Sequence, residues 1–405
     1  MRRRLWILIG TGVLVRVVLG FATRGAAFDV DSFEIVRRAL AHDAMHLYGD
    51  VNQGLARWPY PPAFLPWVAL SGWLSDTVGL SFDGWLQLPM IAADAGIAWV
   101  VQELLRRRGA SEPARLVGAA LVMFGPSFLL TTGYHGQIDS VAILPAVAAL
   151  LVWERGGDRR ALVAGLLIGI GGAVKVVPLV MVLPLVVSAR SRREGLELVV
   201  AAGAVFLTAL APYLLTDGSA MLDSLRNRGF PGLGGLSLIA DPDLADSAIR
   251  GVTPGSSGIT EWIVHNGALV PAAALAGAAV LLVRRRPDPV VGAVLVWLVL
   301  MALGVNFALQ YALWGLPFMI AAGWFRRAAA VQLLLLPAAA VFYMAPWKSE
   351  AATVVYCASM IAAWALLMVL LAGVVRDVAR GGAAGSGLGT DSPPMARHFG
   401  PRSSG

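Results

Sequence analysis

Cysteine and charged residues are scarce in this chain. One cysteine, Cys357, occurs among 405 residues, and Asp, Glu, Lys and Arg together make up 14% of the sequence. A single cysteine excludes a disulfide framework and a metal site built from several cysteine ligands. The sequence also lacks a glycine-rich loop of the kind that holds nucleotide phosphates between a strand and a helix. Disulfide-rich scaffolds and soluble nucleotide-binding domains are therefore excluded.

The charges that are present are mostly arginines. Lysine occurs twice, so 30 of the 32 basic residues are arginines, and the net charge of +7 gives a sequence pI near 10. The arginines lie in short clusters between apolar runs and form no single basic face, so they predict no nucleic-acid partner. Hydrophobic residues make up 58% of the chain, and the mean hydropathy is +0.71. Apolar runs near the roughly 20 residues that cross a bilayer predict an all-α polytopic membrane protein in contact with membrane lipids.

The apolar runs predict about twelve transmembrane helices with both termini on the cytoplasmic side. Short arginine-rich loops stay in the cytoplasm, and this rule orients the runs. The predicted spans are residues 5–22, 86–105, 116–131, 138–153, 161–174, 176–189, 196–215, 263–283, 289–305, 311–324, 328–346 and 351–375. A further run, residues 62–80, fits this count only as a re-entrant or interfacial segment. The N-terminus resembles a signal peptide, and we interpret it as an uncleaved first helix.

The long loops divide the chain and lie on one side of the predicted membrane. We expect a catalytic membrane module at residues 1–215, with a first outer loop at residues 23–61. A large outer loop at residues 216–262, a C-terminal helical membrane module at residues 263–375 and a disordered cytoplasmic tail at residues 376–405 follow. Loops on a rigid scaffold commonly carry function, so functional residues are expected on the outer face.

Lys175 lies inside the apolar run 161–189. A lysine at the centre of a membrane helix costs about 2.5–3.5 kcal/mol on insertion scales, so its presence predicts a functional site with an anionic partner. Arginines flank this run on both sides, at residues 155–160 and 190–193. Both ends therefore face the cytoplasm, and the run is predicted to be a hairpin of two short helices with Lys175 near its outer tip.

The first outer loop contains a predicted amphipathic helix that begins near Asp29 and Asp31 and runs to Leu47. Two interpretations of its acidic residues remain open. Asp31 fits a helix N-cap, with Glu34 as its capping-box partner. A carboxylate at the membrane surface also fits a general base that deprotonates a hydroxyl group. Residues 57–62 follow as a rigid corner of aromatic residues and prolines.

Several short motifs resemble a known superfamily. They are Asp31-Ser32-Phe33-Glu34, Tyr60-Pro61-Pro62, Ile91-Ala92-Ala93-Asp94 and Tyr134-His135-Gly136-Gln137-Ile138-Asp139, followed by Lys175 and Pro178. In this order and on one membrane face, they resemble glycosyltransferases of the GT-C superfamily that use polyprenyl-phosphate sugars. Bacterial mannosyltransferases and the dolichyl-phosphate-glucose-dependent glucosyltransferases of the endoplasmic reticulum are the members that they resemble most. The resemblance covers about the first half of the chain.

The resemblance implies an inverting glycosyltransferase that moves a hexose, with mannose favoured, from a polyprenyl-phosphate donor to an extracytoplasmic lipid, glycan or protein acceptor. Asp31 would be the general base, with Asp29 as the second candidate, and Lys175 would bind the donor phosphate. Together with Glu34 and Asp139, these carboxylates could also hold a hard cation, but the resemblance implies no metal and no cofactor. It places the protein in the bacterial cytoplasmic membrane, with the active site on the extracytoplasmic face.

Further residues are expected to bind substrate: Glu34, Arg37, Tyr60, His135, Gln137, Asp139 and His265. The residues from His135 to Asp139 also fit an ordinary polar turn, and His265 also fits an interfacial histidine at a helix start. We interpret Gln310, Tyr311 and Trp314 as part of an interfacial aromatic belt.

Arg16 and Asp94 lie within two predicted spans, and we predict a buried ion pair between them because either charge alone is expensive in a membrane. These two residues and Lys175 are also the basis of an alternative function, that of a transporter or lipid flippase. In such a protein they would line a path through the helix bundle. The gathering of ionisable residues at the outer face favours the glycosyltransferase.

Overall fold

The computed structural model describes residues 2–52, 57–226, 230–250, 258–344 and 349–381. The described residues form helices and no strand, which confirms the predicted all-α class. The longer helices are α1 (Arg2–Ala22), α5 (Phe82–Arg107), α6 (Glu112–Met123), α8 (Asp139–Arg155), α9 (Arg160–Val174), α11 (Arg192–Thr216), α16 (Leu269–Arg285), α17 (Pro289–Leu303), α18 (Ala312–Ala321), α19 (Phe325–Met344) and α20 (Glu350–Ala379).

Six helical segments in the described part of the chain are long and apolar enough to cross a membrane. They are α1, α5, α11, α19, α20 and the segment Glu112–His135, which joins α6, α7 (Pro126–Leu130) and the π-helix η3 (Thr131–His135). Each of the twelve predicted spans overlaps a helix, but several of these helices are shorter than a bilayer core at 1.5 Å per residue. The number of crossings therefore stays a prediction.

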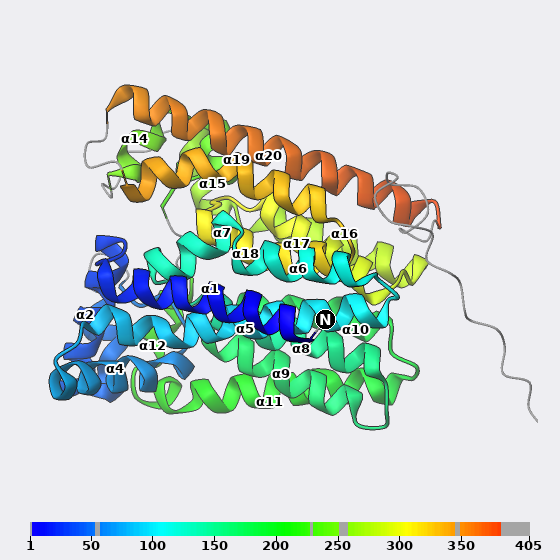
Figure 1. Ribbon diagram of the computed structural model, residues 1–405, viewed down its shortest axis with the longest axis horizontal. Coiled ribbons are helices and arrows are strands. Elements are labelled where there is room, and N and C mark those ends of the chain that lie inside the picture. Colours follow the sequence, from blue (N-terminus) through cyan, green and yellow to red (C-terminus); the bar gives the residue numbers. More distant parts are fainter. Residues whose placement is uncertain (1, 53–56, 227–229, 251–257, 345–348, 382–405) are drawn as a thin grey trace, which may run out of the picture.

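Most of the longer helices run roughly along the long axis of the molecule, and they pack in two groups that lie side by side across it (Figure 1). The N-terminal group holds α1, α5, α8, α9 and α11, and α9 packs between α8 and α11. In the C-terminal group, α20 packs against α16, α17 and α19. Helix α18 contacts both α5 and α8, so it joins the two groups through one buried core.

The predicted hairpin around Lys175 is present. Helix α9 leads to Lys175, whose backbone is extended, and the chain continues into η4 (Val177–Met181) and α10 (Val182–Val187). At the other end of α9, Arg160 Nε lies 2.5 Å from Oε1 of Glu194 at the start of α11. The 15 residues of α9 span about 22 Å, so Lys175 and this ion pair lie at opposite ends of the bundle.

Short helices gather towards the left end of the molecule in Figure 1, among them α2 (Ala27–His42), α4 (Leu65–Val78), α12 (Gly218–Leu225) and α14 (Leu244–Ile249). The predicted N-cap at Asp31 is wrong, because α2 begins at Ala27 with Ala26 in the capping position. Asp29 instead occupies the first turn, where a carboxylate interacts favourably with the helix dipole. The amphipathic character is confirmed, since Phe33 and Val36 are buried.

Further short segments lie in the two predicted outer loops or between the longer helices. They are η1 (Ala44–His46), α3 (Leu47–Val51), η2 (Pro62–Phe64), α13 (Gly235–Ala240), α15 (Ile259–Asn266) and η5 (Leu309–Tyr311). The predicted span 263–283 is divided between α15 and α16, and α20 continues past the predicted boundary at residue 375 to Ala379. Residues 382–405, most of the predicted disordered tail, lie outside the described residues.

The predicted ion pair between α1 and α5 is confirmed. Arg16 Nε lies 2.9 Å from Oδ2 of Asp94, and both side chains are fully buried. Thr132 and Ser140 donate hydrogen bonds to the same carboxylate. The remaining guanidinium donors reach backbone carbonyls, including that of Met123. Each charge is thus compensated by an opposite charge and by hydrogen bonds, as a buried pair requires.

Candidate functional site

A cavity of about 650 Å³ lies where α2, residues 57–60, η3, the tip of the Lys175 hairpin and the start of α18 meet. Aromatic side chains form much of its wall: Phe28, Trp58, Tyr60, Phe230, Tyr311, Trp314, Phe342, Tyr343 and Tyr356. A few ionisable groups converge on it, with Asp29, His135 and Lys175 among them. An apolar cleft with a small number of convergent polar groups is typical of a small-molecule binding site.

Asp29 is the carboxylate of α2 that faces this cavity. Its side chain is 24% exposed, and Oδ2 is hydrogen-bonded to Nε2 of the buried His135. Gln137 also lines the cavity and favours the charged form of this carboxylate. Burial raises the pKa of Asp29, but the hydrogen bond from His135, the neighbouring Gln137 and the charge of Lys175 together lower this pKa below its ordinary value of 3.8. Asp29 is therefore a carboxylate at neutral pH and can accept a proton.

Tyr60 lies between the acidic and the basic parts of the site. Its hydroxyl is 3.4 Å from Oε1 of Gln137, and its ring centroid is 5.1 Å from Nζ of Lys175. Burial and the negative charges of Asp29 and Asp139 raise the pKa of Tyr60 well above 10. Tyr60 therefore stays a neutral hydroxyl that can donate a hydrogen bond.

Lys175 is held by a carboxylate and by three aromatic rings. Its Nζ lies 2.7 Å from Oδ1 of Asp139, a fully buried residue at the first turn of α8. The same oxygen accepts a hydrogen bond from Nε1 of Trp314. The rings of Tyr311 and Trp314 lie 5.2 and 5.3 Å from Nζ, and that of Tyr60 completes the cage. Cation–π contacts of this kind hold an ammonium group with little water around it.

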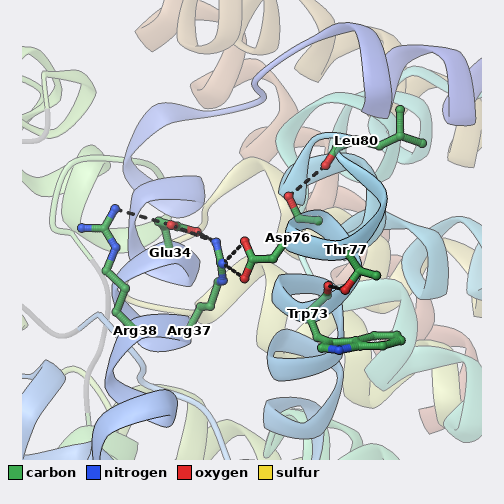
Figure 2. Close-up of polar contacts among 8 residues, drawn as sticks. Glu34, Arg37, Arg38, Trp73, Asp76, Thr77 and Leu80 are labelled. Carbon is green, nitrogen blue, oxygen red and sulfur yellow. Dashed lines mark hydrogen bonds and ion pairs between the residues drawn. The ribbon is translucent and has the colours of Figure 1, made fainter.

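Four residues expected at the site lie away from the cavity. Asp31 pairs with Arg24 at the surface, and its side chain is 49% exposed. Arg37 pairs with Glu34 on its own helix and with Asp76 on α4, so it fastens α2 to α4 (Figure 2). The fourth, His265, is exposed on α15 and does not line the cavity. The other expected residues, Asp29, Tyr60, His135, Gln137 and Lys175, do line it, and Asp139 contacts it through Lys175.

The interpretation of Gln310, Tyr311 and Trp314 as an interfacial belt is wrong, because all three line the cavity and the two aromatic residues enclose Lys175. Tyr343 was also missed, although its hydroxyl lies 2.7 Å from Nδ1 of His135. Both regions belong to the C-terminal half of the chain, and apolar helices with scattered aromatic residues carry no local signal of a site. Only the packing of α18 and α19 against the N-terminal helices brings them there.

The acidic residues do not assemble a metal site in the described part of the chain. There, no group of three or more His, Cys, Asp or Glu side chains is arranged to hold a metal ion. Asp31 and Glu34 each form ion pairs with arginines, and Asp139 is taken by Lys175.

Comparisons with known proteins give the family. The model of glycosyltransferase family 87 matches residues 58–305, which is more than half of the chain. No curated protein matches the sequence. Among solved structures, the apo oligosaccharyltransferase of Archaeoglobus fulgidus is similar with a TM-score of 0.45 and 13% identity, over 93% of this chain and 56% of that protein.

The same archaeal enzyme, AglB, in complex with an inhibitory peptide and a dolichol-phosphate is similar with a TM-score of 0.44 and 13% identity, over 93% of this chain and 56% of that one. The chain thus spans a little over half the length of these structural relatives. The family match decides between the two functions that the sequence left open, an enzyme and a transporter. The chain belongs to glycosyltransferase family 87, and it is a membrane glycosyltransferase of the GT-C superfamily.

Proposed function

We propose that this glycosyltransferase moves a hexose, with mannose favoured, from a polyprenyl-phosphate donor to a hydroxyl group of an extracytoplasmic lipid, glycan or protein acceptor, with inversion at the anomeric carbon. The observation that carries the proposal is one aromatic-walled cavity that holds both a carboxylate and an ammonium group, Asp29 and Lys175. Glycosyl transfer needs a base for the incoming hydroxyl and a positive charge for the leaving phosphate.

Asp29 is the residue that we assign as the general base, in place of the first sequence candidate, Asp31. Asp29 faces the cavity, whereas Asp31 lies at the surface beside Arg24. In the reaction, the carboxylate of Asp29 takes the proton of the acceptor hydroxyl while the oxygen of that hydroxyl bonds to the anomeric carbon. The hydroxyl proton becomes acidic as the bond to the anomeric carbon forms. A carboxylate of low pKa can accept the proton at that stage.

Lys175 is the group that we assign to the donor phosphate. The bond from the anomeric carbon to the phosphate oxygen breaks with its electron pair on that oxygen, so the leaving phosphate gains negative charge. An ammonium group fixed in a largely buried aromatic cage stabilises this charge more strongly than solvent would. Attack from the side opposite to the leaving phosphate inverts the anomeric centre.

The proposed location is the bacterial cytoplasmic membrane, with the cavity on the extracytoplasmic face. The ion pair Arg160–Glu194, next to the arginines at residues 190–193, lies about 22 Å from Lys175 along α9. Because arginine-rich turns stay on the cytoplasmic side, this separation supports a cavity on the opposite face. A lipid-borne donor would then present its sugar at the membrane surface.

Sugar transfer from radiolabelled polyprenyl-phosphate mannose and glucose tests the proposal, in membranes that contain acceptor extracts and the wild type, Asp29→Asn or Asp31→Asn. We expect transfer from one of the donors, a loss of about a hundredfold or more in Asp29→Asn, and near wild-type transfer in Asp31→Asn. The two variants make the same chemical change on the same helix, so each is the control for the other. A loss confined to Asp31→Asn would return the role of base to Asp31, and a wild type without transfer from either donor would contradict the proposed donor class.

A further inference from the structure

His135 occupies a position that the reaction outlined above does not use. It is 1% exposed and lies between two other side chains: Nε2 contacts Oδ2 of Asp29, and Nδ1 lies 2.7 Å from the hydroxyl of Tyr343. A chain of three polar side chains therefore runs from Tyr343 on α19 through His135 to the carboxylate of Asp29 at the cavity.

From these contacts we propose that His135 is a positioning residue, which fixes the orientation and the ionisation of the Asp29 carboxylate, and that Tyr343 holds the imidazole in the tautomer that this task requires. The inference rests on the proposed role of Asp29 as general base.

The donor and acceptor roles along the chain agree with this assignment. An ionised Asp29 only accepts hydrogen bonds, so Nε2 of His135 must carry the proton that lies between them. In a neutral imidazole Nδ1 is then an acceptor, and the hydroxyl of Tyr343 supplies the proton. The Tyr343 hydroxyl and both ring nitrogens of His135 then each have one consistent role as hydrogen-bond donor or acceptor.

The backbone around His135 is built for this contact. Residues Thr131–His135 form a π-helix, a rare geometry that is frequent at functional sites. It ends at Gly136, whose φ of 81° is in the left-handed region that favours glycine. On the other side, Gly25 brings the start of α2 against the same segment. A Cβ atom on Gly25 would lie 2.6 Å from the carbonyl oxygen of Tyr134, so a larger residue would push Asp29 away from His135.

The groups that face Asp29 define how its ionisation depends on His135. They are His135, Lys175, Tyr60, Tyr311 and Tyr343, with the neutral Gln137 beside them. Burial raises the pKa of Asp29, and the hydrogen bond from Nε2 of His135 lowers it against that effect. Without His135, less of the pKa-raising effect of burial is compensated, so the pKa of Asp29 should rise. The acid limb of the transfer rate should then move to higher pH.

The experiment measures kcat, the KM for polyprenyl-phosphate mannose or glucose and the pH dependence of transfer for four variants. His135→Ala removes the donor, whereas His135→Gln keeps an N–H at the position of Nε2 and is the conservative rescue. Tyr343→Phe removes the hydroxyl that fixes the tautomer. Tyr134→Phe is the matched control, since its hydroxyl donates to the backbone oxygen of Tyr343 at 3.1 Å without touching the imidazole.

We expect His135→Ala to lower kcat about a hundredfold, with little change in donor KM and an acid limb at higher pH. His135→Gln should recover kcat to within about tenfold of the wild type and return the acid limb towards its position. Tyr343→Phe should lower kcat about tenfold, and Tyr134→Phe should behave as the wild type. Thermal unfolding of each variant in detergent separates loss of fold from loss of rate.

Two results would overturn the inference while the proposed function stands. One is a folded His135→Ala with wild-type kcat, and the other is a His135→Gln that loses as much rate as His135→Ala without any shift of the acid limb. Failure of the proposed function itself has a different signature, because Asp29→Asn would then keep full transfer or the wild type would show none.

Discussion

Removal of the charge of Lys175 tests the site most directly, and Coulomb's law gives the magnitude. The leaving phosphate gains about one negative charge during the reaction. At about 4 Å and an effective dielectric constant of about 20, a full charge would interact with Lys175 by about 4 kcal/mol. A charge half developed in the transition state corresponds to about 2 kcal/mol, so Lys175→Met is expected to lower kcat at least about thirtyfold.

The same substitution has a structural consequence that a second variant removes. Asp139 is fully buried, and Lys175 is its ion-pair partner. A buried charge left without its partner costs about 3–5 kcal/mol, so Lys175→Met should also lower the melting temperature. The double variant Lys175→Met, Asp139→Asn removes both charges and should recover much of the stability, because the amide oxygen of the new side chain would still accept the hydrogen bond from Trp314.

The assay is transfer of labelled hexose by purified protein in liposomes, with thermal unfolding measured on the same preparations. The loss in kcat should persist in the double variant, and Asp139→Asn alone, which keeps the ammonium group, should retain most of the transfer. The reasoning would be refuted if the stable double variant transferred sugar at the wild-type rate. Lys175 would then serve only to neutralise Asp139.

Further predictions concern the fold that carries the site. Gly25→Ala places a Cβ in the left-handed region, at φ 75°, and against the Tyr134 carbonyl, so stability should fall by about 1–3 kcal/mol and transfer should fall with it. Asp94→Ala leaves Arg16 buried without its carboxylate and should cost about 3–5 kcal/mol in unfolding free energy, which thermal melts in detergent would detect. Since the pKa of Asp29 is lowered in the folded state, its carboxylate contributes stability above pH about 4 that is lost as pH falls through the folded value. Asp29→Asn should therefore show a weaker loss of stability than the wild type between about pH 5 and pH 2, and equal slopes would contradict this.

The sequence could predict the parts of the site that follow from the cost of charge in an apolar setting. Lys175 stood out because a lone lysine in an apolar run needs a partner, and Asp139 is that partner. The ion pair between Arg16 and Asp94 followed from the same cost. The arginines on both sides of the run 161–189 also predicted the hairpin correctly, because both ends had to lie on one side of the membrane.

The choice between neighbouring acids could not be made from the sequence. Asp29 and Asp31 are two residues apart, so on a helix they point in directions about 200° apart, and only one of them can face a given cavity. The sequence pattern predicted an N-cap at Asp31, before the first helical turn. It therefore did not assign Asp29 and Asp31 to different faces of the helix. The structure begins the helix at Ala27, which turns Asp29 towards His135 and leaves Asp31 beside Arg24.

By itself, then, the sequence determined the membrane class, the helical hairpin at Lys175 and the charges that had to be paired, because these depend on local hydropathy and on the cost of isolated charge. Only the tertiary structure decided which side chains share the cavity. Tyr311, Trp314 and Tyr343 come from helices more than 130 residues beyond Lys175 or His135, and they reach the site because α18 and α19 pack against the N-terminal helices. Such contacts depend on how helices pack in three dimensions, and no local pattern in an apolar sequence specifies them.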